Sequence, residues 1–473
     1  MAITLDVTGI LQAAAFWVSN KGGSNGRKLY FYFYLLLTLI SMVVGNDPII
    51  LSGTAFLVYY TAATKLEPVA WLISEFAAAN TASMVLFVGN PTNVVICEGF
   101  RINNAAFTAY TILPFLACSV ACYAALSFQF RDGKHVPRRL NVIGKLNVRQ
   151  VLRDPVSAIF GGVLLITCLV VVIVLSFIHV DVWKVVLPFA VAKFIFDICW
   201  DHHRYSTGLI PKFGEKLADA ETDEDPMISE LTRAMSMPND PERSATSLSL
   251  SAPSNKNPSA ETRIPQTESP SQSSTTIPNV GPKNPLEQSG FFSKQREDFD
   301  YLHKQLSAHF PTFFTALPRL PFGLIPFAFS QFILIEALAA QGWINVFAVW
   351  LVKASNRQMI PTVWLVGVLG VILCNVAGTN IGATILLTKI VHAAQLPASS
   401  EKAAALALAV SSNIGAVSFT FSASLAGLLW KSILNQKGIT IKQATFAFWN
   451  LLPLIMMTSV GLSVVTAIMV VLY

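Results

Sequence analysis

Charged residues are scarce in this chain. Only 13% of the 473 residues are Asp, Glu, Lys or Arg, whereas soluble domains carry about 25%, and 53% are hydrophobic. Because the few charges crowd into a small number of loops, most of the rest of the chain has to lie in lipid. The net charge of +6 does not indicate a nucleic-acid partner, since the basic residues cluster beside apolar segments, as they do at the cytoplasmic face of membrane proteins.

The sequence also lacks the motifs of several chemistries. Its six cysteines show neither CxxC spacing nor a Cys/His metal pattern, which argues against a disulfide framework and against a metal site. A membrane-embedded enzyme would need a motif such as HExxH, and none occurs. A Walker-type phosphate-binding loop is also missing. We therefore expect no catalytic residue, no metal, no cofactor and no ATP hydrolysis by the chain itself.

The apolar residues form segments long enough to cross a bilayer. Residues 158–178 and 451–472 contain no charged side chain, and a helix needs roughly 20 such residues to cross the hydrocarbon core. We expect about seven full crossings and two hairpins that enter and leave on the same side. The predicted fold class is an all-α polytopic membrane protein.

The two halves of the chain resemble each other at a fixed spacing. Between the copies we count five apolar segments, and an odd number of crossings would invert the second copy relative to the first. Inverted repeats with interrupted helices are typical of secondary transporters. Four residues recur 333 positions later and two recur 339 positions later: Gly9, Gly45, Asp47 and Asn80 match Gly342, Gly378, Asn380 and Asn413, and Phe107 and Pro114 match Phe446 and Pro453.

Charge distribution predicts the topology. Residues 131–153 hold seven Lys or Arg and one acid, which places this loop in the cytoplasm. Two scaffold helices within 154–200 would then cross outward and return. Residues 201–318 are rich in Ser, Pro, Asn and Thr, a composition that predicts a disordered cytoplasmic linker.

Each repeat contains a pair of short apolar segments that predicts a re-entrant hairpin. In the first hairpin, at 29–64, the tip reads GNDP (45–48), and its Asn and Asp suit helix caps while its Pro suits a first helical turn. The second hairpin, at 361–395, has GTN (378–380) at its tip. We expect the first to open from the cytoplasm and the second from outside.

A long span that breaks midway follows each hairpin. Residues 70–99 break at GNPTN (89–93), and residues 402–430 break around 422–424. Non-helical backbone at membrane depth is tolerated only where it lines a cavity, so the tips and breaks together predict one shared solute site. Helix N-termini at such breaks favour oxyanions or polarised oxygens. The alternative is that Asn and Pro produce kinks without binding a ligand.

Two acidic residues lie in apolar surroundings. A carboxylate at the hairpin tip costs on the order of 3 kcal/mol on insertion scales, so Asp47 is our candidate for binding a coupling proton or cation; the alternative is a helix cap in reach of cytoplasmic water. For Glu75 we expect snorkelling toward the cytoplasmic end of its span, or an ion pair with Lys65.

Four segments, GNDP, GNPTN, GTNIGATIL and SSNIGAVSFTFSASLAGLLWKSILNQKGITI, resemble the arsenite/antimonite pump membrane protein family. This family belongs to the ion transporter superfamily, with the citrate transporter-like domain. The resemblance extends over most of the chain outside the linker and implies two inverted repeats, with the substrate between hairpin tips and helix breaks. By position it implies that the following residues line the site: Asn46, Asp47, Asn80, Asn90, Thr92, Asn93, Thr379, Asn380, Asn413, Ser422 and Ser424.

The predicted organisation is unequal between the repeats. Repeat 1 has no counterpart for about three scaffold helices, so we expect an N-terminally shortened product or, less favoured, an unusual assembly. In order, the predicted parts are repeat 1 at 1–130 (an interfacial helix, the hairpin 29–64, the broken helix 70–99 and a helix at 106–129), the basic loop 131–153, scaffold helices at 154–200, the linker 201–318, and the remainder of repeat 2 at 319–473 (a helix at 322–340, the hairpin 361–395, the broken helix 402–430 and a last helix at 444–472).

The resemblance favours secondary-active arsenite or antimonite efflux by alternating access. A proton- or sodium-coupled carrier of a carboxylate or inorganic anion, a sodium/proton antiporter, and a truncated membrane protein without transport stay open as alternatives. The expected partners are the lipid bilayer and a small inorganic or organic ion, with a homodimer and a soluble ATPase left open and no nucleic acid. We expect a multi-pass protein, with the plasma membrane favoured over the vacuole or another organelle.

Overall fold

The computed structural model describes residues 1–140, 148–178, 180–210, 293–320 and 322–473. Within these ranges the regular structure is helical, and the one β-type contact is an isolated bridge between Asn25 and Arg139. Five of the described helices are long and apolar enough to cross a membrane, or six if the bent pair 325–340 and 343–355 counts as one span. The all-α polytopic fold class is confirmed.

The first half of the chain forms seven α-helices and a 3₁₀ turn. The first hairpin has a tight tip, because only Gly45 lies between the end of α3 and the start of α4, whereas the broken span has the residues 83–90 between α5 and α6. Gly45 joins α3 to α4 with φ 90°, a left-handed conformation that glycine adopts without strain. The elements are α1 (Ala2–Val7), α2 (Ile10–Gly22), α3 (Gly26–Val44), α4 (Asn46–Ala63), α5 (Pro68–Ala82), η1 (Phe87–Gly89), α6 (Pro91–Gly99) and α7 (Asn104–Gln129).

The middle of the chain contains the helices α8 (Val148–Val151), α9 (Pro155–Ser176), α10 (Val182–Ser206), α12 (Ser293–His309) and α13 (Pro311–Ala316), and the turn η2 (Leu317–Arg319). Both ends of the predicted linker are therefore helical, and describing all of 201–318 as disordered was wrong. A tertiary contact explains the C-terminal part: the carboxylate of buried Asp201 accepts hydrogen bonds from the backbone N–H and Oγ1 of Thr312, at 2.8 and 2.9 Å. Residues 211–292 of the linker lie outside the described residues.

The second half repeats the order of elements seen in the first. Gly9 and Gly342 have φ of 85° and 79° and each precedes a helix of 13 residues, and the long helices α7 and α20 each contain a proline, Pro114 and Pro453. The inversion of the halves across a membrane stays a prediction. The elements are α14 (Leu324–Ala340), α15 (Trp343–Ser355), α16 (Met359–Val376), α17 (Asn380–Ala393), α18 (Ala398–Ile414), η3 (Phe421–Ala423), α19 (Leu425–Gln436) and α20 (Gln443–Leu472).

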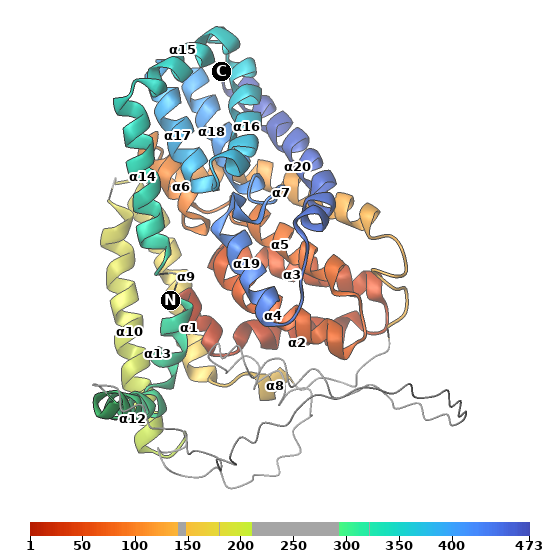
Figure 1. The fold of residues 1–473 in the computed structure, drawn as a ribbon, viewed down its shortest axis with the longest axis vertical. Helices are drawn as coiled ribbons and strands as arrows, with labels where there is room; N and C mark the ends of the chain where they lie inside the picture. The colour runs from red at the N-terminus through yellow and green to blue at the C-terminus, as the bar shows by residue number, and fades with distance from the viewer. Residues whose placement is uncertain (141–147, 179, 211–292, 321) are drawn as a thin grey trace, which may run out of the picture.

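The halves pack against each other through a shared core. Figure 1 shows α20 running beside α7, and α6 of the first half lying against α17 of the second. In the core, the ring centroid of Phe76 on α5 lies 5.4 Å from those of Trp430 on α19 and Phe446 on α20, separations typical of stabilising aromatic pairs. The hairpins and broken helices of both halves are thereby held in one body.

The helix pair α9 and α10 lies at the edge of this body (Figure 1). Along α9, Ile159, Val163, Ile166 and Val170 are each more than half exposed. Their spacing of three and four residues places them on one helix face. An exposed apolar face of this length fits contact with lipid rather than water.

Candidate functional site

The two helix breaks are capped by side chains next to them. After α5 the chain passes through η1, and Asn90 is the N-cap of α6: its Oδ1 accepts the backbone N–H of Thr92 at 3.1 Å. In the second half Ser424 is the N-cap of α19, and its Oγ accepts the N–H of Gly427 at 3.0 Å. Each cap satisfies one of the amides that a helix start leaves free.

The tip of the first hairpin packs directly on the first break. A Cβ atom at Gly45 would lie 3.3 Å from the carbonyl oxygen of Gly89, so a larger residue would push the tip away. Our interpretation of Asn46 and Asp47 as caps was wrong, because α4 begins at Asn46 and its N-cap is Gly45, without a side-chain hydrogen bond. Asn46 instead uses its Nδ2 to donate to Asn80 Oδ1 at 3.1 Å.

The tip of the second hairpin lies against the end of α18. Thr379 is the N-cap of α17 and its Oγ1 accepts the N–H of Ile381 at 3.3 Å. Asn380 Nδ2 donates to the carbonyl oxygen of Ser412 at 3.3 Å. Asn380, the position equivalent to Asp47, therefore contacts the broken helix of its own half, whereas Thr379 caps its own helix.

Hydrogen bonds between side chains join the two breaks. Asn413 on α18 accepts from Ser83 Oγ at 2.9 Å and donates to Asn93 Oδ1 on α6 at 2.8 Å. All three side chains are fully buried. Asn93 Nδ2 donates in turn to the carbonyl oxygens of Ser83 and Leu86, at 2.8 Å each. These are carbonyls left free where α5 ends, and in a membrane interior they have to be satisfied by protein.

We call the connected group the central polar network. Ser83 Oγ donates to the carbonyl oxygen of Asn80 at 2.8 Å, and Ser412 Oγ lies 3.5 Å from Thr92 Oγ1, so the network runs from one hairpin tip to the other. Its members are Asn46, Asn80, Ser83, Thr92, Asn93, Asn380, Ser412 and Asn413.

Not every predicted site residue belongs to this network. Asn90, Thr379 and Ser424 border it as helix caps, and Ser422 contacts Thr420 at 3.4 Å. Asp47 is half-buried at the tip of α4, and within the described part of the chain its carboxylate makes no hydrogen bond. The predicted coupling acid, which follows the network member Asn46 directly, thus takes no part in the described hydrogen bonds of the network.

Sequence reasoning missed several polar residues at the breaks. Ser83 and Ser412 connect the halves, and Asn375 on α16 uses its Oδ1 to accept the N–H groups of Phe419 and Thr420, at 3.2 and 3.1 Å. Ser412 directly precedes the predicted site residue Asn413 in the SSN triplet, and this neighbourhood could have predicted it. Ser83 and Asn375 had no comparable motif.

Our expectation for Glu75 was wrong. Its side chain is fully buried and neither snorkels nor pairs with Lys65. Thr54 Oγ1 on α4 donates to its carboxyl oxygens, at 2.9 and 3.0 Å, because α4 packs along α5 and covers this position.

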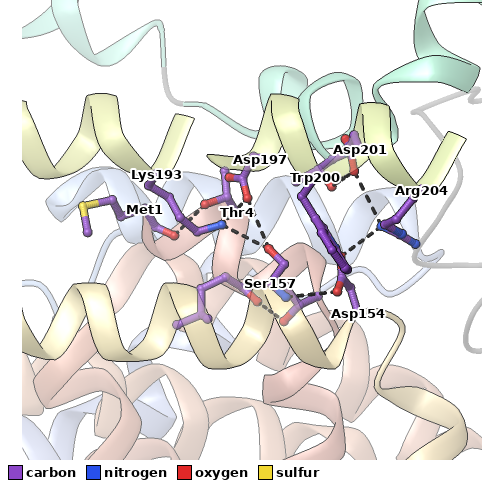
Figure 2. Close-up of polar contacts among 12 residues, drawn as sticks. Met1, Thr4, Asp154, Ser157, Lys193, Asp197, Trp200, Asp201 and Arg204 are labelled. Carbon is purple, nitrogen blue, oxygen red and sulfur yellow. Dashed lines mark hydrogen bonds and ion pairs between the residues drawn. The ribbon is translucent and has the colours of Figure 1, made fainter. Parts of the chain in front are cut away.

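A second group of charged residues joins α9 to α10 (Figure 2). Lys193 and Asp197 on α10 form an ion pair while only 1% and 4% exposed, and Lys193 Nζ also donates to Ser157 Oγ on α9 at 3.2 Å. Nearer the end of α10, Arg204 Nη1 donates to Asp154 Oδ2 at 3.0 Å. This cluster was not predicted, although Lys193 and Asp197, two opposite charges four residues apart in an apolar helix, were a usable signal in the sequence.

The central polar network is closed in this conformation, since none of its members is more than 5% exposed. A pocket lies elsewhere, between α2, α3 and α4, where Leu11, Phe33 and Ile49 are among the lining residues. Because the network residues satisfy one another, a solute would bind there by replacing some of these hydrogen bonds.

Comparison with known proteins identifies relatives that are similar in sequence. The family model described as "Citrate transporter" matches residues 1–202. The arsenical pump membrane protein of Escherichia coli K12 is 25% identical over 213 residues, which are 44% of this chain and 49% of that protein. The protein of the same name from Yersinia enterocolitica is 26% identical over 201 residues, or 41% of this chain and 46% of its own.

A further relative is the 46 kDa membrane protein of Mycobacterium leprae, 25% identical over 175 residues, 36% of this chain and 40% of the relative. The chain spans about half the length of the curated relatives it matches. The matches agree with the resemblance found in the motifs and with the apolar helices of the structure. The chain is a multi-pass integral membrane protein that is similar to the citrate transporter family over residues 1–202 and to arsenical pump membrane proteins.

Proposed function

We propose that the chain is a secondary-active transporter that exports arsenite or antimonite by alternating access. The observation that carries the proposal is the central polar network, which joins the breaks of the two halves through Asn413, Ser83 and Asn93. Its side chains are amides and hydroxyls, which both donate and accept hydrogen bonds. Such groups suit arsenous acid, an uncharged solute with hydroxyl groups.

In this proposal the two halves are inverted repeats, and each moves its hairpin against its broken helix. The network would open first to one side of the membrane and then to the other. The chain itself would catalyse no reaction. A homodimer, a soluble ATPase partner and location in the plasma membrane are proposals that rest on the family analogy.

Transport of arsenite into inside-out vesicles would test this function. Cells without their own arsenite exporter would produce the chain, and vesicles from them would be given arsenite with and without an imposed proton gradient. We expect accumulation above that of vesicles from cells with an empty vector. Equal accumulation, with the chain detected in the vesicle membrane, would contradict the proposal.

A coupled carboxylate carrier is the second candidate, because the matching family model is described as a citrate transporter. The same vesicles given labelled citrate would separate the two. Citrate movement without arsenite movement would favour this candidate. The central polar network contains no Lys or Arg, and a multiply charged anion would lack a cationic partner there.

Replacing Asp47 by asparagine is expected to uncouple transport. Asp47 lies half-buried at the tip of α4, and the substitution keeps the shape of the side chain while it removes the charge that would attract a proton or cation. We expect arsenite flux to lose its dependence on the imposed proton or sodium gradient. The measurement is initial flux at several gradients.

The matched control for this substitution is Asp132→Asn, in the exposed part of the basic loop. It is expected to leave the gradient dependence unchanged. If Asp47→Asn behaves like the control, Asp47 does not bind the coupling ion.

A further inference from the structure

A carboxyl group is buried in the core that the two halves share. Glu75 lies on α5, seven residues after the helix begins at Pro68, and is 0% exposed. Its neighbours along the helix, including Ile73 and Phe76, are fully buried apolar residues. An ionisable side chain inside a membrane protein is rarely kept without a function.

Two elements, α4 and α19, face this carboxyl group. Thr54 on α4 donates to both carboxyl oxygens, and α4 also approaches closely at Gly53, where a Cβ atom would lie 2.8 Å from Glu75 Oε1. The buried indole of Trp430 on α19 lies near the same group, and its Nε1 makes no hydrogen bond with good geometry to the described residues. Glu75 is therefore in contact with a hairpin of the first half and a broken helix of the second.

No counter-ion accompanies Glu75 among the ion pairs of the described residues. The helices packed against α5 are α3, α4, α7, α18, α19 and α20. Their titratable groups near α5 include the hydroxyl of Tyr30, which is bonded to Ser74, and the thiol of Cys122. Their charged residues are exposed or half-buried and are not among its contacts: Arg27, Lys28, Asp47, Glu401, Lys402 and Lys431.

Burial without a counter-ion determines the charge of Glu75. Removing a carboxylate from water costs several kcal/mol unless a cation or several hydrogen-bond donors compensate. One hydroxyl and one indole are poor compensation for a full charge, whereas a protonated carboxyl group both donates and accepts and suits the hydroxyl of Thr54. Burial of Glu75 beside these donors, without a cation, therefore favours the protonated form of its carboxyl group.

We propose that Glu75 is a proton-binding site of the transport cycle, covered and uncovered by the hairpin helix α4. The carboxyl group keeps its proton while Thr54 and Gly53 lie against it, and it releases the proton to water when α4 moves away. The ion so formed takes up a proton again before α4 returns. This inference rests on the proposed transport function and adds a residue that exchanges the proton.

Infrared spectroscopy tests the protonation without requiring transport. The purified chain at neutral pH is expected to show the carbonyl band of a protonated carboxylic acid, and Glu75→Gln is expected to remove it while the protein keeps its elution volume and helicity. The matched control is Glu98→Gln at the exposed end of α6, which should leave the band unchanged. A Glu75→Gln difference spectrum without this band would show that the carboxyl group is ionised, and would overturn the inference.

A second experiment tests the role in transport. Liposomes with an internal pH indicator and the wild-type chain are expected to report proton movement when an arsenite gradient is applied. Glu75→Gln should lower that movement to the level of empty liposomes, and the pH dependence of arsenite flux should disappear. Proton movement equal to that of the wild type would overturn the inference.

The two proposals fail in different ways. A wild type that moves no arsenite contradicts the proposed solute, while the infrared band still decides whether Glu75 carries a proton. The liposome assay is then repeated with citrate. Loss of proton movement in Glu75→Gln with either solute supports the inference, and unchanged movement contradicts it.

Discussion

Replacing Asp197 by leucine is expected to lower the free energy of unfolding by about 3–5 kcal/mol. The change leaves the ammonium group of Lys193 buried beside Ser157, whose hydroxyl cannot neutralise it. Since the penalty comes from an uncompensated charge, it exceeds the contribution of the ion pair itself. Thermal unfolding of the purified chain in detergent, followed by circular dichroism or by loss of the monodisperse elution peak, measures the effect.

The double variant Lys193→Met with Asp197→Leu separates charge from packing. Because both charges are gone, it is expected to be about as stable as the wild type or more stable by ~1–4 kcal/mol. Asp181→Leu is the control, since its ion pair with Lys184 is about half exposed and contributes at most about 1 kcal/mol. If Asp197→Leu unfolded at the same temperature as the wild type, the cluster between α9 and α10 would not stabilise the fold.

Replacing Asn413 by leucine is expected to abolish transport while the chain still inserts in the membrane. The substitution leaves Asn93 Oδ1 without its donor at 2.8 Å, at a cost of about 1–3 kcal/mol for a buried polar group. Ser83 Oγ loses its acceptor at 2.9 Å but keeps the carbonyl oxygen of Asn80. It also removes the side-chain amide that hydrogen-bonds α18 to Ser83 and Asn93 of the first half. Arsenite flux in vesicles, divided by the amount of chain in the membrane, measures the loss.

The control for this variant is Asn435→Leu, on the exposed end of α19, which should transport normally. Asn90→Leu is expected to resemble Asn413→Leu, because it removes the cap of α6. Flux retained in Asn413→Leu would show that the central polar network only joins the halves and does not contact the solute.

Local features of the structure could be predicted from the sequence because their signals are local. Asn90 followed by Pro91 is a cap and a first helical residue whatever surrounds it. The positive φ of Gly45 and Gly378 likewise follows from the geometry of a tight turn. The helical fold class follows from composition alone, because lipid offers the backbone no alternative partner.

Partners distant in the sequence could not be predicted in the same way. Asn46 was expected to cap its own helix, but Asn80, 34 residues away, binds its amide. Glu75 was expected to reach the membrane surface, but α4 covers it. The helical segment at 311–316 was hidden by the average composition of the linker, because its contacts, such as those of Thr312 with Asp201 and of Phe313 with Phe194, are with residues distant in the sequence. Each of these wrong predictions applied a local rule to residues whose contacts are with distant parts of the chain.

The buried amides of the central polar network already hydrogen-bond one another, and this limits the affinity of the site for a solute. A solute that enters replaces existing hydrogen bonds, such as that between Asn413 and Asn93, with new ones. The net gain in binding free energy per exchanged hydrogen bond is only about 0.5–1.5 kcal/mol. Occupancy should therefore saturate at high concentration, and residence should be brief. Low affinity favours turnover, because a transporter that bound its solute tightly would release it slowly on the opposite side of the membrane.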